Sequence, residues 1–120
     1  AAREAAGRSM VLLKNEDGAL TLAAGQKIAV IGPLGDNQHD MLGPWCGNGQ
    51  DADAVTVYAG IKSVNENTTF TQGSTIADKE PPNNTPADLC GSSAVFKAAV
   101  TAAKKADVVV LAHGESRGQS

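Results

Sequence analysis

The chain has 120 residues, of which 42% are hydrophobic and 19% are charged, and its formal net charge is −3. This length is sufficient for one modest domain with a buried core. The charge balance excludes a basic surface for nucleic acid and a basic amphipathic helix for a membrane surface. The longest apolar run, at 107–112, is much shorter than the roughly 20 residues that span a bilayer. This composition leaves the compartment open.

The two cysteines, Cys46 and Cys90, have no C-x-x-C spacing and no histidines close by in the sequence. Zinc sites need several such ligands together, so the pattern argues against one. One disulfide and two buried thiols are both compatible with the sequence. The first ten residues carry scattered charges and no apolar centre, unlike a signal peptide. The start at Ala1 favours a processed chain or a piece of a longer one.

The first predicted element is a helix over residues 1–15, where apolar residues recur at three- and four-residue spacing. Glu4 and Arg8 stand four residues apart, in the order that favours a helical ion pair. The helix is expected to end near Gly18, which can adopt a left-handed conformation. A linker then leads to residue 26.

The run 27–32 is short, apolar and rich in β-branched residues, which predicts a buried strand. A long loop rich in Gly, Pro, Asn and Asp follows at 32–53, and loops of this length are commonly functional. Residues 54–65 favour a helix with Asp53 as its N-cap, although 55–58 alone would fit a strand.

A second strand is predicted at 68–73 and an irregular insertion at 74–93, which is rich in Pro, Asn and Ser. Ser93 is a suitable N-cap for the helix that follows. The expected inner stripe of this helix is apolar and consists of Phe96, Ala99, Val100 and Ala103. Residues 107–112 give the clearest strand of the chain.

This alternation of helices and strands predicts an α/β fold, a three-layer sandwich with a mostly parallel sheet flanked by helices. Ligands of such sheets gather at the carboxyl ends of the strands. Two polar loops leave those ends here, at 32–53 and at 113–120. We therefore expect these two loops to form the functional edge of the sheet.

Several segments, in this order, resemble one family. The segment AREAAGRSMVLLKNEDGALTL (2–22) is similar to the entry into the second domain of glycoside hydrolase family 3. The strand KIAVIGPLGDN (27–37), the loop MLGPWCGNGQ (41–50) and the strand exit ADVVVLAHGES (106–116) continue the likeness. It covers almost the whole chain except about 74–92, which looks like a variable insert.

The resemblance implies an exo-acting β-glycosidase, typically a β-glucosidase. We expect no cofactor, and the composition argues against nucleic-acid and membrane partners. In this family a barrel domain carries an aspartate nucleophile, and the second domain supplies a glutamate as general acid and base. The reaction is retaining hydrolysis, which needs two carboxyl groups roughly 5–5.5 Å apart. The implied partners are a carbohydrate, the barrel and the remainder of the sandwich domain.

The chain departs from this pattern at both catalytic positions, so no residue of it is assigned a catalytic role. It contains no barrel, and the family's glutamate is expected just beyond Ser120. Glu115 is a different residue. We therefore expect 1–26 to be the entry into the domain and 27–120 the N-terminal part of an incomplete sandwich. The chain alone is predicted to be inactive.

Three residues are candidates for positions close to the substrate, and each has a plainer interpretation. Trp45 could stack on a sugar or line the entrance, or it could pack its loop onto the domain. Asp36 could contact a ligand, but turn chemistry also explains an aspartate there. Glu115 could border the sugar site or be an exposed loop residue.

Other features of these loops favour plain structural roles. His39 and His113 stand far apart without companion ligands, so we expect neither to bind metal. Residues 32–37 match neither G-x-G-x-x-G nor the Walker pattern. The alternative function is a non-catalytic Rossmann-like module that binds a small ligand or serves a structural role. A partial sheet also leaves an unpaired edge, so we expect the chain alone to self-associate or be marginally stable.

Overall fold

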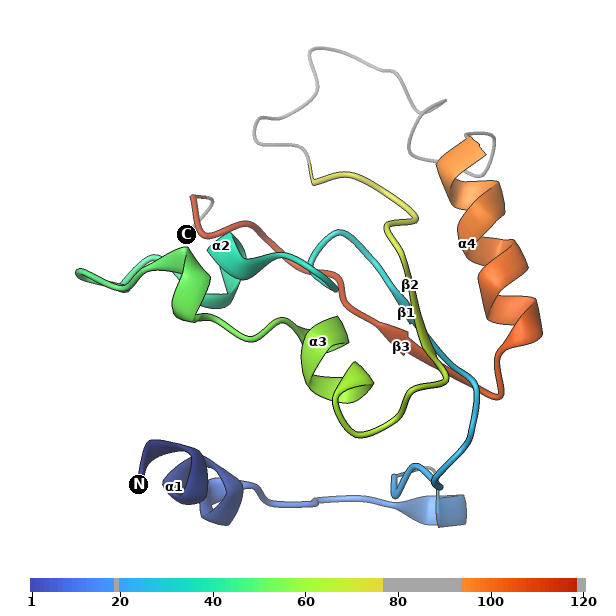
Figure 1. Cartoon of the computed structure of the whole chain (residues 1–120), viewed down its shortest axis with the longest axis horizontal. Coiled ribbons are helices and arrows are strands. Elements are labelled where there is room, and N and C mark those ends of the chain that lie inside the picture. The colour runs from blue at the N-terminus through green and yellow to red at the C-terminus, as the bar shows by residue number, and fades with distance from the viewer. Residues whose placement is uncertain (19, 77–93, 119–120) are drawn as a thin grey trace.

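The sheet is at the centre of the structure, a computed structural model that describes residues 1–18, 20–76 and 94–118 (Figure 1). Its three strands are β1 (Ile28–Ile31), β2 (Thr68–Thr71) and β3 (Val108–Leu111). β1 lies between the other two and pairs with both in parallel, with Ile28 opposite Thr68 and Val108. The predicted α/β class with a parallel sheet is confirmed, and all three predicted strands are present within two residues of their predicted bounds.

β1 forms the core because it is covered on both faces and on both edges. All four of its residues are buried, and Ile28 and Val30 are no more than 1% exposed. Burying an aliphatic side chain of this size contributes about 1.5–3 kcal/mol. A continuous apolar run is the expected pattern for a strand buried on both faces.

The two main helices cover opposite faces of the sheet, as Figure 1 shows. α4 (Ala94–Lys105) packs against Ala29 and Ile31 through Ala99. α3 (Val57–Lys62) covers the other face near β2, where the rings of Tyr58 and Phe70 lie 5.8 Å apart. The connections from β1 to β2 and from β2 to β3 run in opposite directions along the sheet and over opposite faces, so both have the same handedness. Parallel connections are right-handed in nearly all proteins.

The helix predicted at 54–65 is shorter, and its predicted N-cap is wrong. Asp53 belongs to a single 3-10 turn, Asp51–Asp53, and α3 begins after Thr56. Thr56 has an extended backbone, and its hydroxyl accepts a hydrogen bond from the Ala59 N–H at 3.0 Å. A threonine in that conformation satisfies an orphan donor of the first turn.

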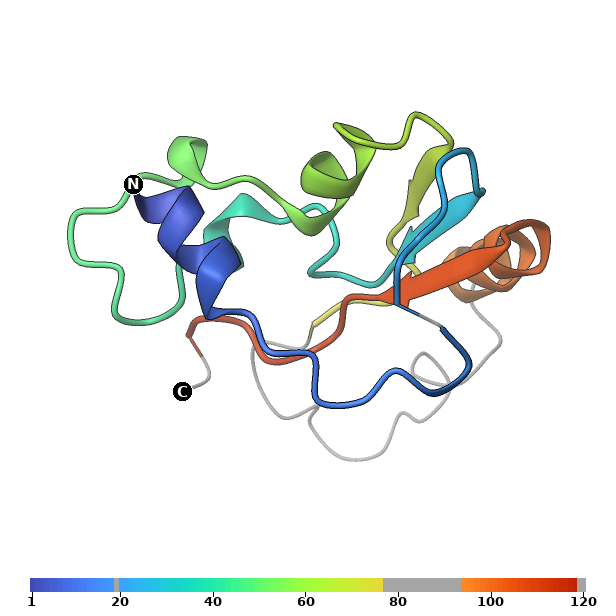
Figure 2. The ribbon, with the colours of Figure 1, turned by 90° about the horizontal axis from the view of Figure 1, so that it is seen from below.

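The N-terminal helix is also shorter than predicted. α1 spans Ala2–Ser9, and Met10 is already extended. The Glu4–Arg8 ion pair forms at 2.7 Å, yet no residue of α1 is buried, and α1 lies apart from the sheet in Figures 1 and 2. An undocked helix of this length gains little from packing, so nothing extends it through the apolar run that follows. Gly18 does have a positive φ of 64°, within a short turn.

The apolar stripe predicted on the last helix is only partly buried. Ala99 is 6% exposed, whereas Phe96 is 41% exposed. The predicted N-cap Ser93 and most of the predicted insertion lie outside the described residues. Within the described part of the chain, no helix has the length and apolar content needed to cross a membrane.

Candidate functional site

The carboxyl ends of β1 and β3 approach each other closely at the point where both strands leave the sheet. The Ala112 N–H donates to the Ile31 oxygen at 2.7 Å, and the Leu34 N–H donates to the Ala112 oxygen at 3.2 Å. Gly32 has a φ of 130°, and a Cβ there would lie 2.2 Å from the Ala112 oxygen. Glycine is required here because the segments that leave β1 and β3 cross without room for a side chain.

The two polar loops therefore start side by side, as the sequence predicted. With the strand order β2-β1-β3, the chain reverses its direction across the sheet between β1 and β3. Such switch points are where open α/β sheets place their ligands. In Figures 1 and 2 the segment with α2 (Gln38–Met41) and the segment after β3 lie on the same side of the sheet.

Side chains of the first loop, residues 32–53, hold the second loop, the segment from residue 113, in place. The Asp40 carboxylate accepts a hydrogen bond from the Arg117 main-chain N–H at 2.8 Å, across 77 residues of sequence. The Arg117 guanidinium lies 3.5 Å from the carboxylate of Asp51, whose other oxygen lies 2.9 Å from His39 Nδ1. Sequence reasoning missed Asp51 and Arg117, because no local spacing connects residues so far apart.

Asp36 has a clear structural partner in this arrangement. The hydroxyl of Thr56 donates to its carboxylate at 2.7 Å, and Thr56 is only 4% exposed. Asp36 itself is exposed. It thus ties the start of the loop to the N-terminus of α3, which leaves its second oxygen free for a ligand or for water.

Trp45 and Glu115 both face solvent. Trp45 is 94% exposed, so it does not pack its loop onto the described part of the chain. Glu115 is exposed as well, on the loop that Asp40 holds. An indole this exposed is unusual for a tryptophan, whose apolar surface is normally covered.

Neither histidine belongs to a metal site in the described residues. His39 contacts Asp51, and no group of three or more His, Cys, Asp or Glu in residues 1–18, 20–76 and 94–118 could hold a metal ion. Cys46 is a free thiol near the Gly47 oxygen, and Cys90 lies outside the described residues.

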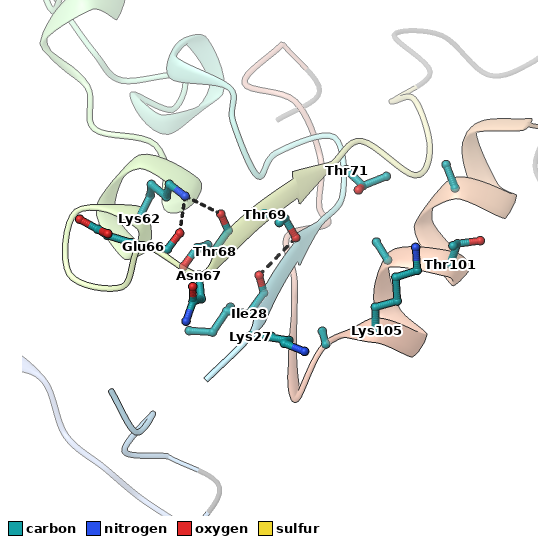
Figure 3. A pocket seen from close by; sticks show the side chains of 13 residues that line it. Lys27, Ile28, Lys62, Glu66, Asn67, Thr68, Thr69, Thr71, Thr101 and Lys105 are labelled. Carbon is teal, nitrogen blue, oxygen red and sulfur yellow. Dashed lines mark hydrogen bonds between the residues drawn. The ribbon is translucent and has the colours of Figure 1, made fainter. Parts of the chain in front are cut away.

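Two hollows flank α4 on its face of the sheet, and they differ in chemistry. The first, about 690 Å³, lies toward β2, and its lining combines threonines and lysines with Ile28 and alanines. Figure 3 shows Thr69 and Thr71 from β2 opposite Thr101 and Lys105 from α4. On its far side Lys62 donates to the main-chain oxygens of Glu66 and Thr68, so this lysine is occupied in holding a turn (Figure 3).

The second hollow, about 620 Å³, lies toward β3 and is mainly apolar. Its lining includes Ile31, Phe96, Val100, Ala103, Val109 and Leu111, so the predicted stripe of α4 faces this hollow. Neither hollow is lined by Trp45, Asp36 or Glu115. We therefore place the candidate functional site at the two loops, where the strand ends and the polar side chains converge.

Comparison with known proteins gives a consistent result over nearly the whole chain. Residues 10–120 match the family described as the glycosyl hydrolase family 3 C-terminal domain. A periplasmic β-glucosidase of Salmonella typhimurium is 37% identical over an aligned length of 130 residues, which covers 99% of this chain. The chain spans only 17% of the length of that relative.

Solved structures of a Listeria innocua β-glucosidase have the same fold. The structure of its D270A mutant with laminaribiose is 33% identical and superimposes with a TM-score of 0.71, covering 97% of this chain and 14% of the relative. The structure with gluconolactone gives 30% identity and a TM-score of 0.69, covering 99% and 15%. Sequence and structure agree, and the chain belongs to the C-terminal domain family of glycosyl hydrolase family 3.

Proposed function

We propose that this chain is part of a retaining, exo-acting β-glycosidase of the β-glucosidase type, which hydrolyses terminal β-linked sugars. The chain would be the first part of the second domain and would border the sugar site. The observation that carries this proposal is the continuous likeness to β-glucosidases through the two loops at the β1/β3 switch point. Those relatives are β-glucosidases, and one of them was solved with glucose bound.

The chemistry divides between this chain and the rest of the protein. Retaining hydrolysis needs a nucleophilic carboxylate and a second carboxyl group that protonates the leaving oxygen. We assign neither role to a residue of this chain. The nucleophile would come from a barrel domain, and the proton donor would follow Ser120, at the end of the loop that starts after β3.

The residues of this chain that we place near the substrate are Trp45, Asp36 and Glu115. Trp45 presents an uncovered indole, which suits stacking on a sugar ring at the entrance of the site. Asp36 has one carboxylate oxygen held by Thr56, so a second oxygen is oriented and can accept from a sugar hydroxyl. Glu115 stands on the loop that would lead to the proton donor.

We also propose that residues 27–120 are the N-terminal part of a larger sandwich, entered through residues 1–26. The support is the uneven coverage of the sheet. Val109 and Leu111 of β3 are 39% and 67% exposed, on the same face as Ala29 and Ile31, which α4 covers. Apolar side chains in a row beside an apolar hollow indicate a surface that is covered in the complete domain.

Topology identifies what would cover this surface. A further parallel strand beside β3 would continue the sheet in the direction already taken from β2 to β3. Because parallel crossovers are right-handed, its connecting helix would lie on the same face as α4. That helix would fill the second hollow and cover Leu111.

The test is an activity assay on the complete reading frame that encodes this chain. The complete protein and the isolated chain of 120 residues are incubated with a panel of aryl glycosides. We expect turnover of an aryl β-glucoside or β-xyloside by the complete protein only. Turnover by the isolated chain would contradict the assignment of the catalytic groups, and a folded complete protein inactive on the whole panel would contradict the proposed function.

A further inference from the structure

Two carboxylates of the first loop, Asp40 and Asp51, both contact Arg117 of the second loop. Asp40 accepts the main-chain N–H of Arg117 at 2.8 Å, and Asp51 lies 3.5 Å from its guanidinium. The main chain and the side chain of Arg117 are thus held by different acids. Both acceptors are carboxylates, but only the Asp40 contact has the length of a normal hydrogen bond, because the Asp51–Arg117 ion pair is 3.5 Å long.

Both acids are themselves fixed. The other carboxylate oxygen of Asp40 accepts from the Asn37 side chain at 2.6 Å, and the Asp40 N–H donates to the Asn37 side-chain oxygen at 3.1 Å. Asn37 is the N-cap of α2, so Asp40 is anchored to the first turn of that helix. The ring of His39 holds Asp51 at 2.9 Å. The grip on Arg117 therefore comes from a preformed surface.

The place of Arg117 in the chain gives this contact its consequence. Arg117 stands two residues after Glu115 and three before Ser120. Since one residue spans at most about 3.6 Å, the residue after Ser120 lies within about 14 Å of the Arg117 Cα. A tie at Arg117 thus restricts where a proton donor on this loop can be placed, and a displacement of about 1 Å can cost about 10²-fold in rate.

We propose that Asp40 and Asp51 are positioning residues for the general acid of the β-glycosidase, acting through Arg117. This role requires no contact of either residue with the substrate or the reacting atoms. Asp40 fixes the position of the loop by accepting the Arg117 main-chain N–H. Asp51 restricts the Arg117 guanidinium through the ion pair. This inference rests on the proposed function and adds to it a role for residues that the sequence alone did not connect.

The test uses the complete protein and two β-glucosides that differ in their need for protonation. An alkyl β-glucoside has a poor leaving group and depends on the general acid, whereas a dinitrophenyl β-glucoside leaves without its help. For Asp40→Ala we expect kcat/KM on the alkyl glucoside to fall about 10²-fold and kcat/KM on the dinitrophenyl glucoside to change little. Asp40→Asn retains an oxygen for the Arg117 N–H but loses the acceptor of the Asn37 amide, so a smaller loss than for Asp40→Ala is expected.

Asp51→Asn is the second variant. It removes the charge that Arg117 and His39 contact and leaves the Asn37–Asp40 hydrogen bonds in place. A smaller loss, again selective for the alkyl glucoside, is expected. Asp53→Ala is the matched control, an acid of the same 3-10 turn. Equal losses on both glucosides, or none, would overturn the positioning role while the parent enzyme remains active. A parent protein that cleaves neither glucoside would instead contradict the proposed function.

Discussion

Thr56 connects the first loop of the candidate site to the helix that follows it. Its hydroxyl donates to Asp36 and accepts from the Ala59 N–H, and the residue is 4% exposed. One buried hydroxyl therefore caps α3 and orients a carboxylate at the edge of the site. The two roles depend on the same oxygen.

Replacing Thr56 with alanine should weaken both contacts. The loss of an N-cap hydroxyl costs about 0.5–2 kcal/mol, and Thr56→Ala is expected at the upper end because Asp36 also loses its donor. Thr56→Ser keeps the hydroxyl and is the matched control. Denaturant unfolding of both variants measures the difference, and equal midpoints would contradict this role of the hydroxyl.

Gly32 sets the crossing of the two strand exits. A Cβ there would lie 2.2 Å from the Ala112 oxygen, at a φ that side chains rarely adopt. Gly32→Ala should destabilise the domain by about 3 kcal/mol or more, through strain and overlap together. Gly118→Ala, with nothing within 4 Å of the added carbon, should be close to neutral. Thermal unfolding separates the two variants, and a mild effect at Gly32 would show that the exits can move apart.

Single residues of the site were predictable from sequence only in part. Position along the chain was enough to place Asp36, Trp45 and Glu115 on the two loops that leave the sheet. The partners of Asp36 and Arg117 were not predictable, because they depend on how those loops fold back over 20 and 77 residues. Local turn chemistry explains an aspartate equally well whether or not it has a distant partner.

At the level of elements, burial decides which predictions hold. β1 is predicted correctly because a short continuous apolar run is typical of a strand that is buried on both faces of a parallel sheet. The prediction for residues 1–15 is wrong beyond Ser9 because the apolar run from Met10 to Leu13 has no surface to pack on in the described chain. Those four residues are 61–92% exposed.

The apolar flank of β3 gives a prediction at the scale of the element. In the isolated chain, Leu111→Glu should reduce self-association, because it places a charge in the exposed apolar hollow. Thr69→Glu, at an exposed position on the opposite edge strand and the same face, should leave self-association unchanged. Sedimentation velocity compares the self-association of the two variants. An equal change in both would show that the isolated chain does not associate through β3.

In the complete protein, Leu111→Glu should be destabilising. If a further helix covers Leu111, then Leu111→Glu buries a charge and should lower the free energy of unfolding by about 2 kcal/mol or more. Thr69→Glu again serves as the control. An unchanged free energy of unfolding of the complete protein with Leu111→Glu would contradict the proposed continuation of the sheet beside β3.

For the molecule as a whole, the described residues expose more apolar surface than a self-sufficient domain of this size needs. Leu111, Trp45 and the run from Met10 to Leu13 are all exposed. We expect the isolated chain to self-associate or to unfold with low cooperativity, and the complete protein to do neither. A monomeric chain with a cooperative, high-temperature calorimetric transition would contradict this expectation.

The most direct test of the central claim is the anomer first released from a β-glucoside by the complete protein, followed by proton NMR before mutarotation. A retaining glycosidase releases the β-anomer first, because two inversions restore the starting configuration. We predict β-glucose as the first product from the complete protein and no product from the isolated chain. α-Glucose as the first product, or hydrolysis by the isolated chain, would contradict the account.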